Sequence, residues 1–172
     1  MGYLEGMFRN VNDFFNAWDY ESKATLKVFR ELTDASLAQK VSPEGRSLGF
    51  LAWHITTTLS EMMSAAGLAV HATTENQPVP STAAAIAATY EKGAKAVADA
   101  VRASWTDAQL TDTIPMYGEM WTKAGVLGAL IGHQCHHRGQ VTVLMRQAGL
   151  RVPGVYGPSK EEWAAMGMAP QS

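Results

Sequence analysis

The segment from His133 to His137 carries three histidines within five residues. If this segment is helical, the side chains of His133 and His137 leave one face of the helix one turn apart, because successive residues are rotated by about 100°. Both imidazoles could then bind the same ion. Cys135 would point away from that face, so we expect it to pack against another helix and not to join the site.

Both histidines belong to a series with the three-and-four spacing of a helix face that is directed into a bundle. The members of this first series are Leu130, His133, His137, Gln140 and Leu144. A second series with the same spacing contains one more histidine, and its members are Leu51, His54, Thr58, Glu61 and Ala65. The spacing therefore predicts three imidazoles on the inward-facing positions of two helices.

Three imidazoles in a protein interior call for a common explanation. Burying one unpaired imidazole costs about 1 to 3 kcal/mol, and three of them would repel one another if they became charged. A metal ion removes both penalties, and neutral imidazole suits zinc, nickel, copper and iron. We therefore predict a divalent transition metal on His54, His133 and His137, with open positions for water or substrate. The simpler alternative is that each histidine is a hydrogen-bonded packing residue.

Two further residues are candidates for proton transfer at such a site. Glu61 belongs to the same series as His54, two helical turns further on, and His136 directly precedes His137. Either side chain could carry a proton, although a solvated glutamate and a surface histidine are the simpler interpretations. Gln134 stands where the HExxH motif of zinc peptidases has its catalytic glutamate, so the sequence disfavours peptide hydrolysis of that type.

Apolar periodicity predicts four helices that would position these side chains. The expected helices cover about residues 4–32, 48–70, 83–104 and 122–148. Ser47 and Ser81 are candidate caps of the second and third helices, and Gly149 closes the fourth. Residues 105–120 lack helical periodicity and indicate an extended, turning connection. The fold class expected from this pattern is an all-α four-helix bundle, in which the long second connection allows an order other than simple up and down.

Length and composition indicate one globular domain that spans residues 1–172, with the tail 150–172 packing on the bundle. The chain is 47% hydrophobic and 17% charged, with a formal net charge of −2, so it has no strong positive field for nucleic acid or anionic lipid. Its apolar stretches are too short to span a membrane, and no signal-peptide pattern opens it. The single cysteine excludes an internal disulfide. We expect a cytoplasmic protein without nucleic-acid or membrane partners.

Three segments together resemble the DinB-like (YfiT-like) metalloenzyme superfamily: HQCHHRGQ at residues 133–140, LAWHI at 51–55 and PGVYGPS at 153–159. The resemblance covers nearly the whole chain. It implies a four-helix bundle with a long crossover, frequent homodimers, and a histidine triad that maps to His54, His133 and His137. The resemblance also implies zinc or nickel as the metal and leaves the choice between them open.

The same resemblance offers a first hypothesis for the reaction, because relatives include thiol transferases that use mycothiol or bacillithiol and a mycothiol-dependent isomerase. The expected chemistry is activation of a low-molecular-weight thiol for attack on an electrophilic substrate, since a metal ion lowers the pKa of a thiol. Metal-dependent hydrolysis is the second hypothesis, with Glu61 or His136 as proton carrier. The third is a non-catalytic metal-binding bundle, whose ion would be needed for folding.

Overall fold

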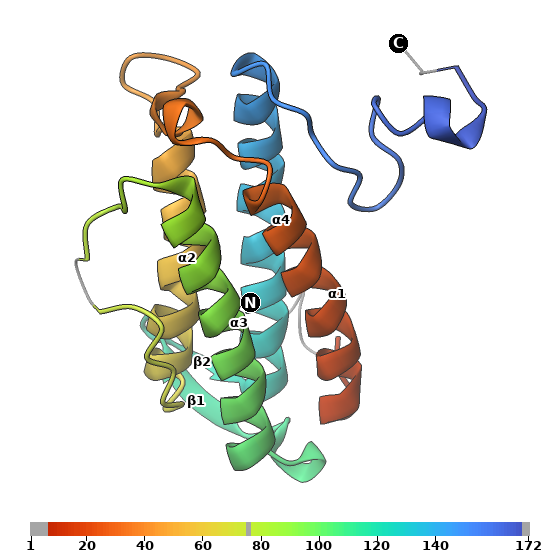
Figure 1. Ribbon diagram of the computed structural model, residues 1–172. Coiled ribbons are helices and arrows are strands. Elements are labelled where there is room, and N and C mark those ends of the chain that lie inside the picture. The colour runs from red at the N-terminus through yellow and green to blue at the C-terminus, as the bar shows by residue number, and fades with distance from the viewer. Residues whose placement is uncertain (1–6, 75–76, 170–172) are drawn as a thin grey trace.

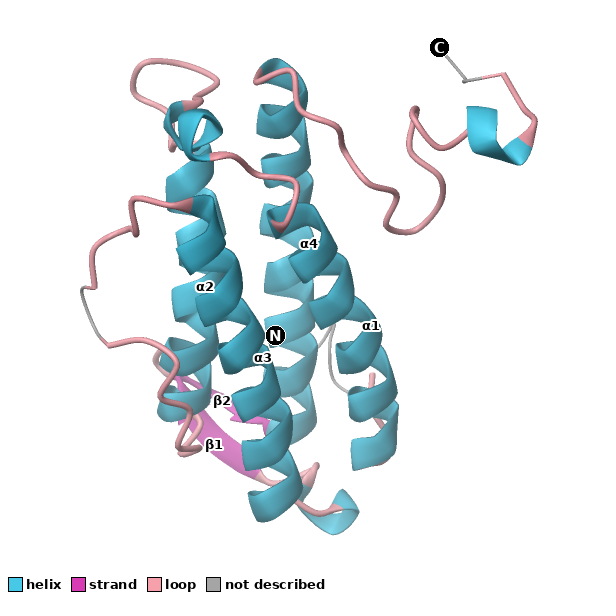
Figure 2. Ribbon diagram, in the orientation of Figure 1, coloured by secondary structure: helices cyan, strands magenta, loops and turns pink. Residues whose placement is uncertain are grey.

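The computed structural model describes residues 7–74 and 77–169. Within them, four long helices lie side by side (Figures 1 and 2): α1 (Val11–Phe29), α2 (Leu48–Ala65), α3 (Ala83–Ser104) and α4 (Lys123–Gln147). The shorter elements are η2 (Asp34–Ala38), η3 (Asp107–Gln109), η4 (Ala164–Met166), β1 (Thr113–Met116) and β2 (Glu119–Thr122). The predicted all-α four-helix bundle is confirmed. None of the described helices combines the length and the apolar character that crossing a membrane requires.

The helices do not simply alternate in direction along the chain. α1 and α4 run one way, and α2 and α3 run the other way (Figure 1). α2 packs against α3 and α4, and α1 packs against the same two helices. Residues 66–74 and 77–82 lie along the length of the bundle between α2 and α3, which confirms the long crossover. As a result, α2 and α4 are antiparallel neighbours.

A side-chain cap fixes the first turn of each helix. Backbone N–H groups of α1, α2, α3 and α4 donate to the side chains of Asn10, Ser47, Thr82 and Thr122. These bonds satisfy donors that have no partner within the helix. Ser47 agrees with the prediction, whereas the expected cap at Ser81 is wrong by one residue.

Two of the predicted helix boundaries are also wrong. α1 begins at Val11 because the Asn10 cap starts it there, although Phe8 outside the helix is buried and meets the Phe14 ring edge to face at 5.7 Å. Leu4, the predicted start, lies outside the described residues. α2 ends at Ala65 and not near residue 70, because Gly67 adopts a φ of 80°, which glycine favours and which ends a helix.

The connection between α3 and α4 contains a structure that the sequence did not predict, a two-stranded antiparallel hairpin. Strands β1 and β2 pair Thr113 with Thr122 and Met116 with Glu119. Tyr117 and Gly118 form the two-residue turn, and both have positive φ angles, 52° and 85°. Met116 is buried and anchors the hairpin to the bundle. The rest of the hairpin is largely exposed.

The chain after α4 contacts the bundle at several points and then extends away from it (Figure 1). Gly149, with a φ of 73°, closes α4 as predicted. The Tyr156 hydroxyl donates to the carboxylate of Glu21 on α1 at 2.9 Å, and Lys27 donates to the Gly154 carbonyl at 3.0 Å. These contacts hold the first part of the tail across α1.

A buried amide joins three of the four helices. Gln134 of α4 is fully buried, accepts a hydrogen bond from the Tyr90 hydroxyl of α3 at 3.0 Å, and donates to the Ile55 carbonyl of α2 at 3.2 Å. Only a group with both a donor and an acceptor satisfies both partners. This requirement explains why an amide and not a carboxylate occupies position 134.

Replacing this amide by a carboxyl group tests the network. Gln134→Glu should lower the free energy of unfolding by about 2 to 4 kcal/mol at neutral pH, because a carboxylate cannot donate to the Ile55 carbonyl. Burial would raise the folded-state pKa above the unfolded value, so the loss should grow from pH 5 to pH 8. Denaturant unfolding at both pH values measures it. The exposed Gln147→Glu is the control, and equal effects of the two variants would contradict the interpretation.

Candidate metal centre

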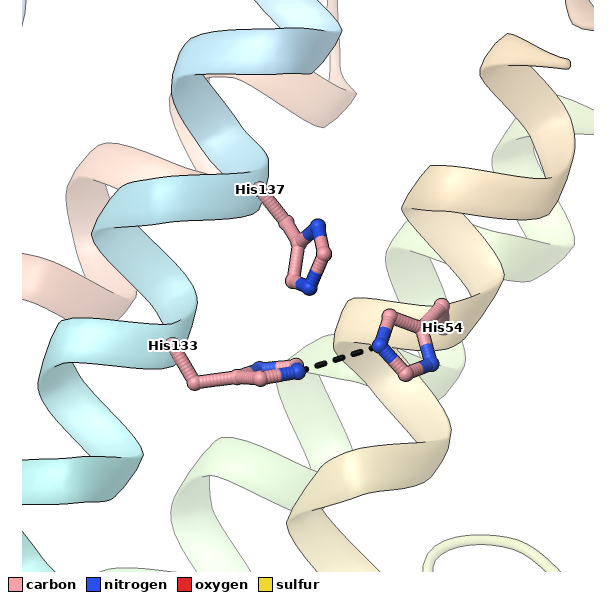
Figure 3. A group of neighbouring side chains, drawn as sticks. All are labelled: His54, His133 and His137. Atoms are coloured by element: carbon pink, nitrogen blue, oxygen red, sulfur yellow. Dashed lines mark hydrogen bonds between the residues drawn. The ribbon is translucent and has the colours of Figure 1, made fainter. Parts of the chain in front are cut away.

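Three imidazoles converge between α2 and α4, and Figure 3 shows their rings facing one another. The ring centroid of His54 lies 4.8 Å from that of His133 and 4.7 Å from that of His137, and the latter two are 4.4 Å apart. The Nε2 atoms of His54 and His133 are 3.0 Å apart. One potential ligand atom from each ring lies within 4.8 Å of the others. The structure thus brings together the three residues singled out from the sequence.

The site lies at the edge of the bundle and not deep in its core, which corrects the expectation of inward-facing imidazoles. His54 and His133 are only partly buried, whereas His137 is 8% exposed. The reason is visible in the two series, because Gln140 on α4 and Glu61 on α2 are exposed members of the same helix faces. These two faces meet near the surface of the bundle.

The chemistry of the three rings fits a transition metal. Burial and mutual repulsion, mainly by His137, lower the pKa of His133 to about 4. Burial is also the largest cause of the lowered pKa values of His54 and His137. The rings are therefore neutral at pH 7 and keep the lone pairs that an ion requires. Within the described residues, the groups near enough to act as ligands are these three histidines, with no carboxylate among them.

Gln140 fixes the orientation of one ring. Its Oε1 lies 2.8 Å from Nδ1 of His137, so it accepts the proton of that nitrogen and leaves Nε2 free to face the other two rings. Its Nε2 donates to Nε2 of His136 at 3.1 Å. The Nδ1 atom of His133 is buried without a hydrogen-bond partner in the described structure. Gln140 was recognised from the sequence only as a member of the helix face, and its role comes from the structure.

A cleft of about 650 Å³ opens beside His54, between α2 and the connection that follows it. Phe50, Trp53, Pro78 and Val79 give it an apolar wall, and hydroxyl side chains from both segments line the rest. The Trp53 indole donates to the Gln77 carbonyl at 2.9 Å, which ties the two walls together. A cleft with apolar and hydrogen-bonding groups is typical of a small-molecule site.

Ser60 is a residue whose role the sequence did not reveal. Its hydroxyl oxygen lies 3.1 Å from the backbone N–H groups of both Ala72 and Thr73 and accepts from them. It therefore anchors the connection against α2 and shapes the second wall of the cleft. Ser60 has this role because the connection after α2 folds back onto it. The sequence alone does not show that the chain returns to this point of α2.

The structure separates the two candidate proton carriers. Glu61 lines the same cleft as His54 and hydrogen-bonds to the Tyr117 hydroxyl at 2.8 Å, without contact to the histidine rings. His136 is exposed, and its ring centroid lies 4.7 Å from that of His137, but it does not line the cleft. Glu61 is thus the candidate within reach of a molecule in the cleft.

The opposite face of α4 holds a buried ion pair. Arg138 is 2% exposed and donates to the Glu21 carboxylate at 2.6 Å. It also donates to the hydroxyls of Thr25 at 3.1 Å and Tyr156 at 2.6 Å. Cys135 lies at this cluster, 2.9 Å from the Tyr156 hydroxyl and away from the three histidines, as expected.

Comparisons with known proteins agree with this architecture. A model of the DinB family matches residues 7–171. YrdA of Bacillus subtilis (strain 168), described as uncharacterized, is 43% identical over 162 residues, which are 94% of this chain and 97% of YrdA. The crystal structure of a DinB-like protein from Bacillus cereus ATCC 10987 has 43% sequence identity and a TM-score of 0.84, and it covers 87% of this chain and all of that one.

Comparison with a more distantly related structure shows similarity of the fold only. YfiT from Bacillus subtilis, described as a probable metal-dependent hydrolase with an unusual four-helix bundle topology, is 18% identical with a TM-score of 0.59. The match covers 80% of this chain and 89% of YfiT. The order of helices described above is therefore found in another protein of low sequence identity.

Metal content tests the site directly. Tag-free protein that has never met a nickel column should contain about one equivalent of a transition metal by mass spectrometry, because three neutral imidazoles converge on one point. His54→Ala and His137→Ala should lose it while the helical circular dichroism signal persists. His71→Ala, which changes an exposed histidine outside the cluster, is the control. Wild-type protein that cannot be loaded with any metal would overturn the site.

The lowered histidine pKa values predict how the metal-free protein responds to acid. Between the ordinary value of 6.5 and the folded value of about 4 for His133, the unfolded chain binds a proton that the folded chain does not. Stability should therefore fall as the pH is lowered through this window. The part due to His133 should be on the order of 1 kcal/mol, because the ring is partly exposed and screened.

Unfolding of the metal-free protein at pH 7.5 and pH 4.5 measures this effect. His133→Asn should lose less stability between the two pH values than the wild type does, and His71→Ala should lose as much. Identical losses in wild type and His133→Asn would show that the ring titrates as it does in the unfolded chain.

Proposed function

The chain belongs to the DinB family, and we propose that it is a metal-dependent enzyme that acts on small molecules. The observation that carries this proposal is the convergence of His54, His133 and His137 beside a cleft of about 650 Å³. Three protein ligands leave positions open for a ligand, as in catalytic sites and unlike closed structural ones. We propose zinc or nickel as the ion.

The reaction that we favour is transfer of a low-molecular-weight thiol to an electrophilic substrate. A divalent ion on three neutral imidazoles keeps its full charge and would lower the pKa of a thiol in the cleft. No carboxylate of the described residues hydrogen-bonds to the three rings, so these residues place no carboxylate base at the ion. A thiol, with an ordinary pKa of about 8.5, needs such a base far less than water does.

The chain's own residues would bind and orient the substrate. Gln140 keeps Nε2 of His137 directed to the site, and Ser60 and Trp53 hold the walls of the cleft together. The side chains of Phe50 and Val79 offer a bound molecule an apolar surface. We propose a thiol and an electrophile as the small-molecule partners and a homodimer as the working form.

Hydrolysis is the second candidate, and the position of Glu61 favours it. This carboxylate lines the cleft and could relay a proton to or from a molecule bound there. It follows His54 by seven residues, about 10 Å along the helix, so it would act at the far end of a substrate or through water. Because Glu61 does not contact the three histidine rings, we rank hydrolysis below thiol transfer.

A thiol-transfer assay distinguishes these reactions. Protein loaded with one equivalent of zinc or nickel should consume thiol in the presence of an electrophilic test substrate at least about 100-fold faster than His54→Ala treated alike. Cysteine, glutathione, bacillithiol and mycothiol are the thiols to compare, and His71→Ala is the control variant. No transfer with any of them, together with an ester or amide hydrolysis rate that Glu61→Gln abolishes, would replace this proposal by hydrolysis.

A further inference from the structure

The far end of the cleft carries an isolated negative charge. Glu61 is the only formally charged side chain among the described residues that line the cleft. No lysine or arginine within residues 7–74 and 77–169 forms an ion pair with it, and its one hydrogen bond there is to the Tyr117 hydroxyl. Exposed carboxylates elsewhere on the helices, such as Asp19, Glu91 and Asp99, have basic partners. The charge of Glu61 is therefore available to a ligand.

The residue that holds Glu61 has an unfavourable backbone conformation. Tyr117 occupies the first position of the hairpin turn with a φ of 52°, where asparagine, aspartate or glycine is usual. A left-handed conformation costs a non-glycine residue roughly 1 to 2 kcal/mol. Such strain persists where the surrounding structure imposes it, often at functional sites.

The hydrogen bond to Glu61 is not needed to dock the hairpin. Met116 is 1% exposed and anchors the first strand, and the backbone N–H groups of Lys123 and Ala124 donate to carbonyls before the hairpin. Tyr117 is 57% exposed, so a bond between its hydroxyl and a surface carboxylate adds little stability. What the bond does is fix one carboxylate oxygen, Oε1, and leave the other open.

Tyr117 remains a donor over the whole neutral range. Burial and the neighbouring Glu61 carboxylate both raise the pKa of its hydroxyl. Its ring packs on Trp121 of the second strand, with centroids 5.6 Å apart, which keeps the side chain on the α2 side of the hairpin. Figure 1 shows the hairpin beside the end of α2 where Glu61 lies.

The two ends of the cleft lie near side chains of opposite charge. Near His54, the Arg46 guanidinium, which is not part of the cleft lining, lies 5.1 Å from the Phe50 ring centroid. At the other end, seven residues along α2, stands Glu61. The separation along the helix axis is about 10 Å. A complementary ligand would have an electron-pair donor at one end and a positive charge at the other.

We propose that the cleft binds an elongated ligand whose far end carries an ammonium group, which Glu61 receives while Tyr117 acts as the residue that positions this carboxylate. This inference rests on the proposed function, because the histidine site would bind the other end. It assigns Glu61 a role in binding and not in proton transfer. The ligand class is an aminothiol or another amine with a metal-binding group about 10 Å away.

Matched probes test this assignment on the zinc-loaded protein. The first pair is 8-aminooctane-1-thiol and 8-hydroxyoctane-1-thiol, and the second is octan-1-amine and octan-1-ol, which lack sulfur. Isothermal titration calorimetry should show about three- to tenfold tighter binding of the amine in each pair, as expected for one partly exposed ion pair. Glu61→Gln should remove the preference and leave the affinity for the hydroxyl probes unchanged.

Two variants separate positioning from structure. Tyr117→Phe removes only the hydroxyl, so it should reduce the preference for the amine without moving the thermal midpoint. Glu119→Gln removes a charge from the same hairpin, where Glu119 accepts from the Trp121 indole, but it is outside the cleft and should keep the preference. Retained preference in Tyr117→Phe would remove Tyr117 from the assignment.

The outcomes for the two proposals are distinct. Equal affinity for amine and hydroxyl probes in wild type, or a preference that survives Glu61→Gln, overturns the ammonium site even if the thiols bind. Failure of both thiols to bind, with an octan-1-amine preference that depends on Glu61, overturns thiol transfer and retains the ammonium site.

Discussion

The hydrogen bond between the Gln134 amide and the Ile55 carbonyl sets the register on which the metal centre depends. Gln134 directly follows His133, and Ile55 directly follows His54, so the bond joins the neighbours of two rings whose Nε2 atoms are 3.0 Å apart. Sliding one helix by a single residue would move these atoms by about 1.5 Å and separate them. The Tyr90 hydroxyl of α3 donates to the oxygen of this amide, and this bond fixes the orientation in which the amide nitrogen faces the Ile55 carbonyl.

The edge position of the site reconciles two opposing requirements. The rings must be desolvated enough to stay neutral, and their pKa values are lowered for that reason. They must also remain accessible, and the cleft beside His54 provides the access. A site in the centre of the bundle would satisfy only the first requirement. The crossover between α2 and α3 supplies the other wall of the cleft, since its residues 77–79 line the cleft together with His54, and Ser60 anchors it to α2.

Periodicity predicted what depends on a single helix. It placed His133 and His137 on one face, set His54 on a second helix, and put Cys135 on the opposite side. It could not predict the edge position, because a helix face gives a direction and not the identity of the neighbour. The boundary at Asn10 was missed because apolar spacing continued through a capping residue. The hairpin was missed because its strands are four residues long and mostly exposed. The bond between Tyr117 and Glu61 joins residues 56 positions apart, which no local pattern shows.

α4 is fixed from two sides, and the pair His137 and Arg138 shows why this matters. These adjacent residues point to different faces, one toward the metal centre and the other into the ion pair with Glu21 of α1. A buried ion pair contributes little net stability, but it costs several kcal/mol to break by removing one partner, so it favours one arrangement of helices over others. Tyr156 of the tail completes this pair, since it accepts from Arg138 and donates to Glu21.

The rotation of α4 about its own axis is thereby fixed from two sides. The ion pair fixes it on the α1 side, and the Gln134 amide fixes it on the α2 side. The three imidazoles can converge only if both constraints act on α4. This helix supplies two of the rings, and any rotation of α4 would move both of them away from His54.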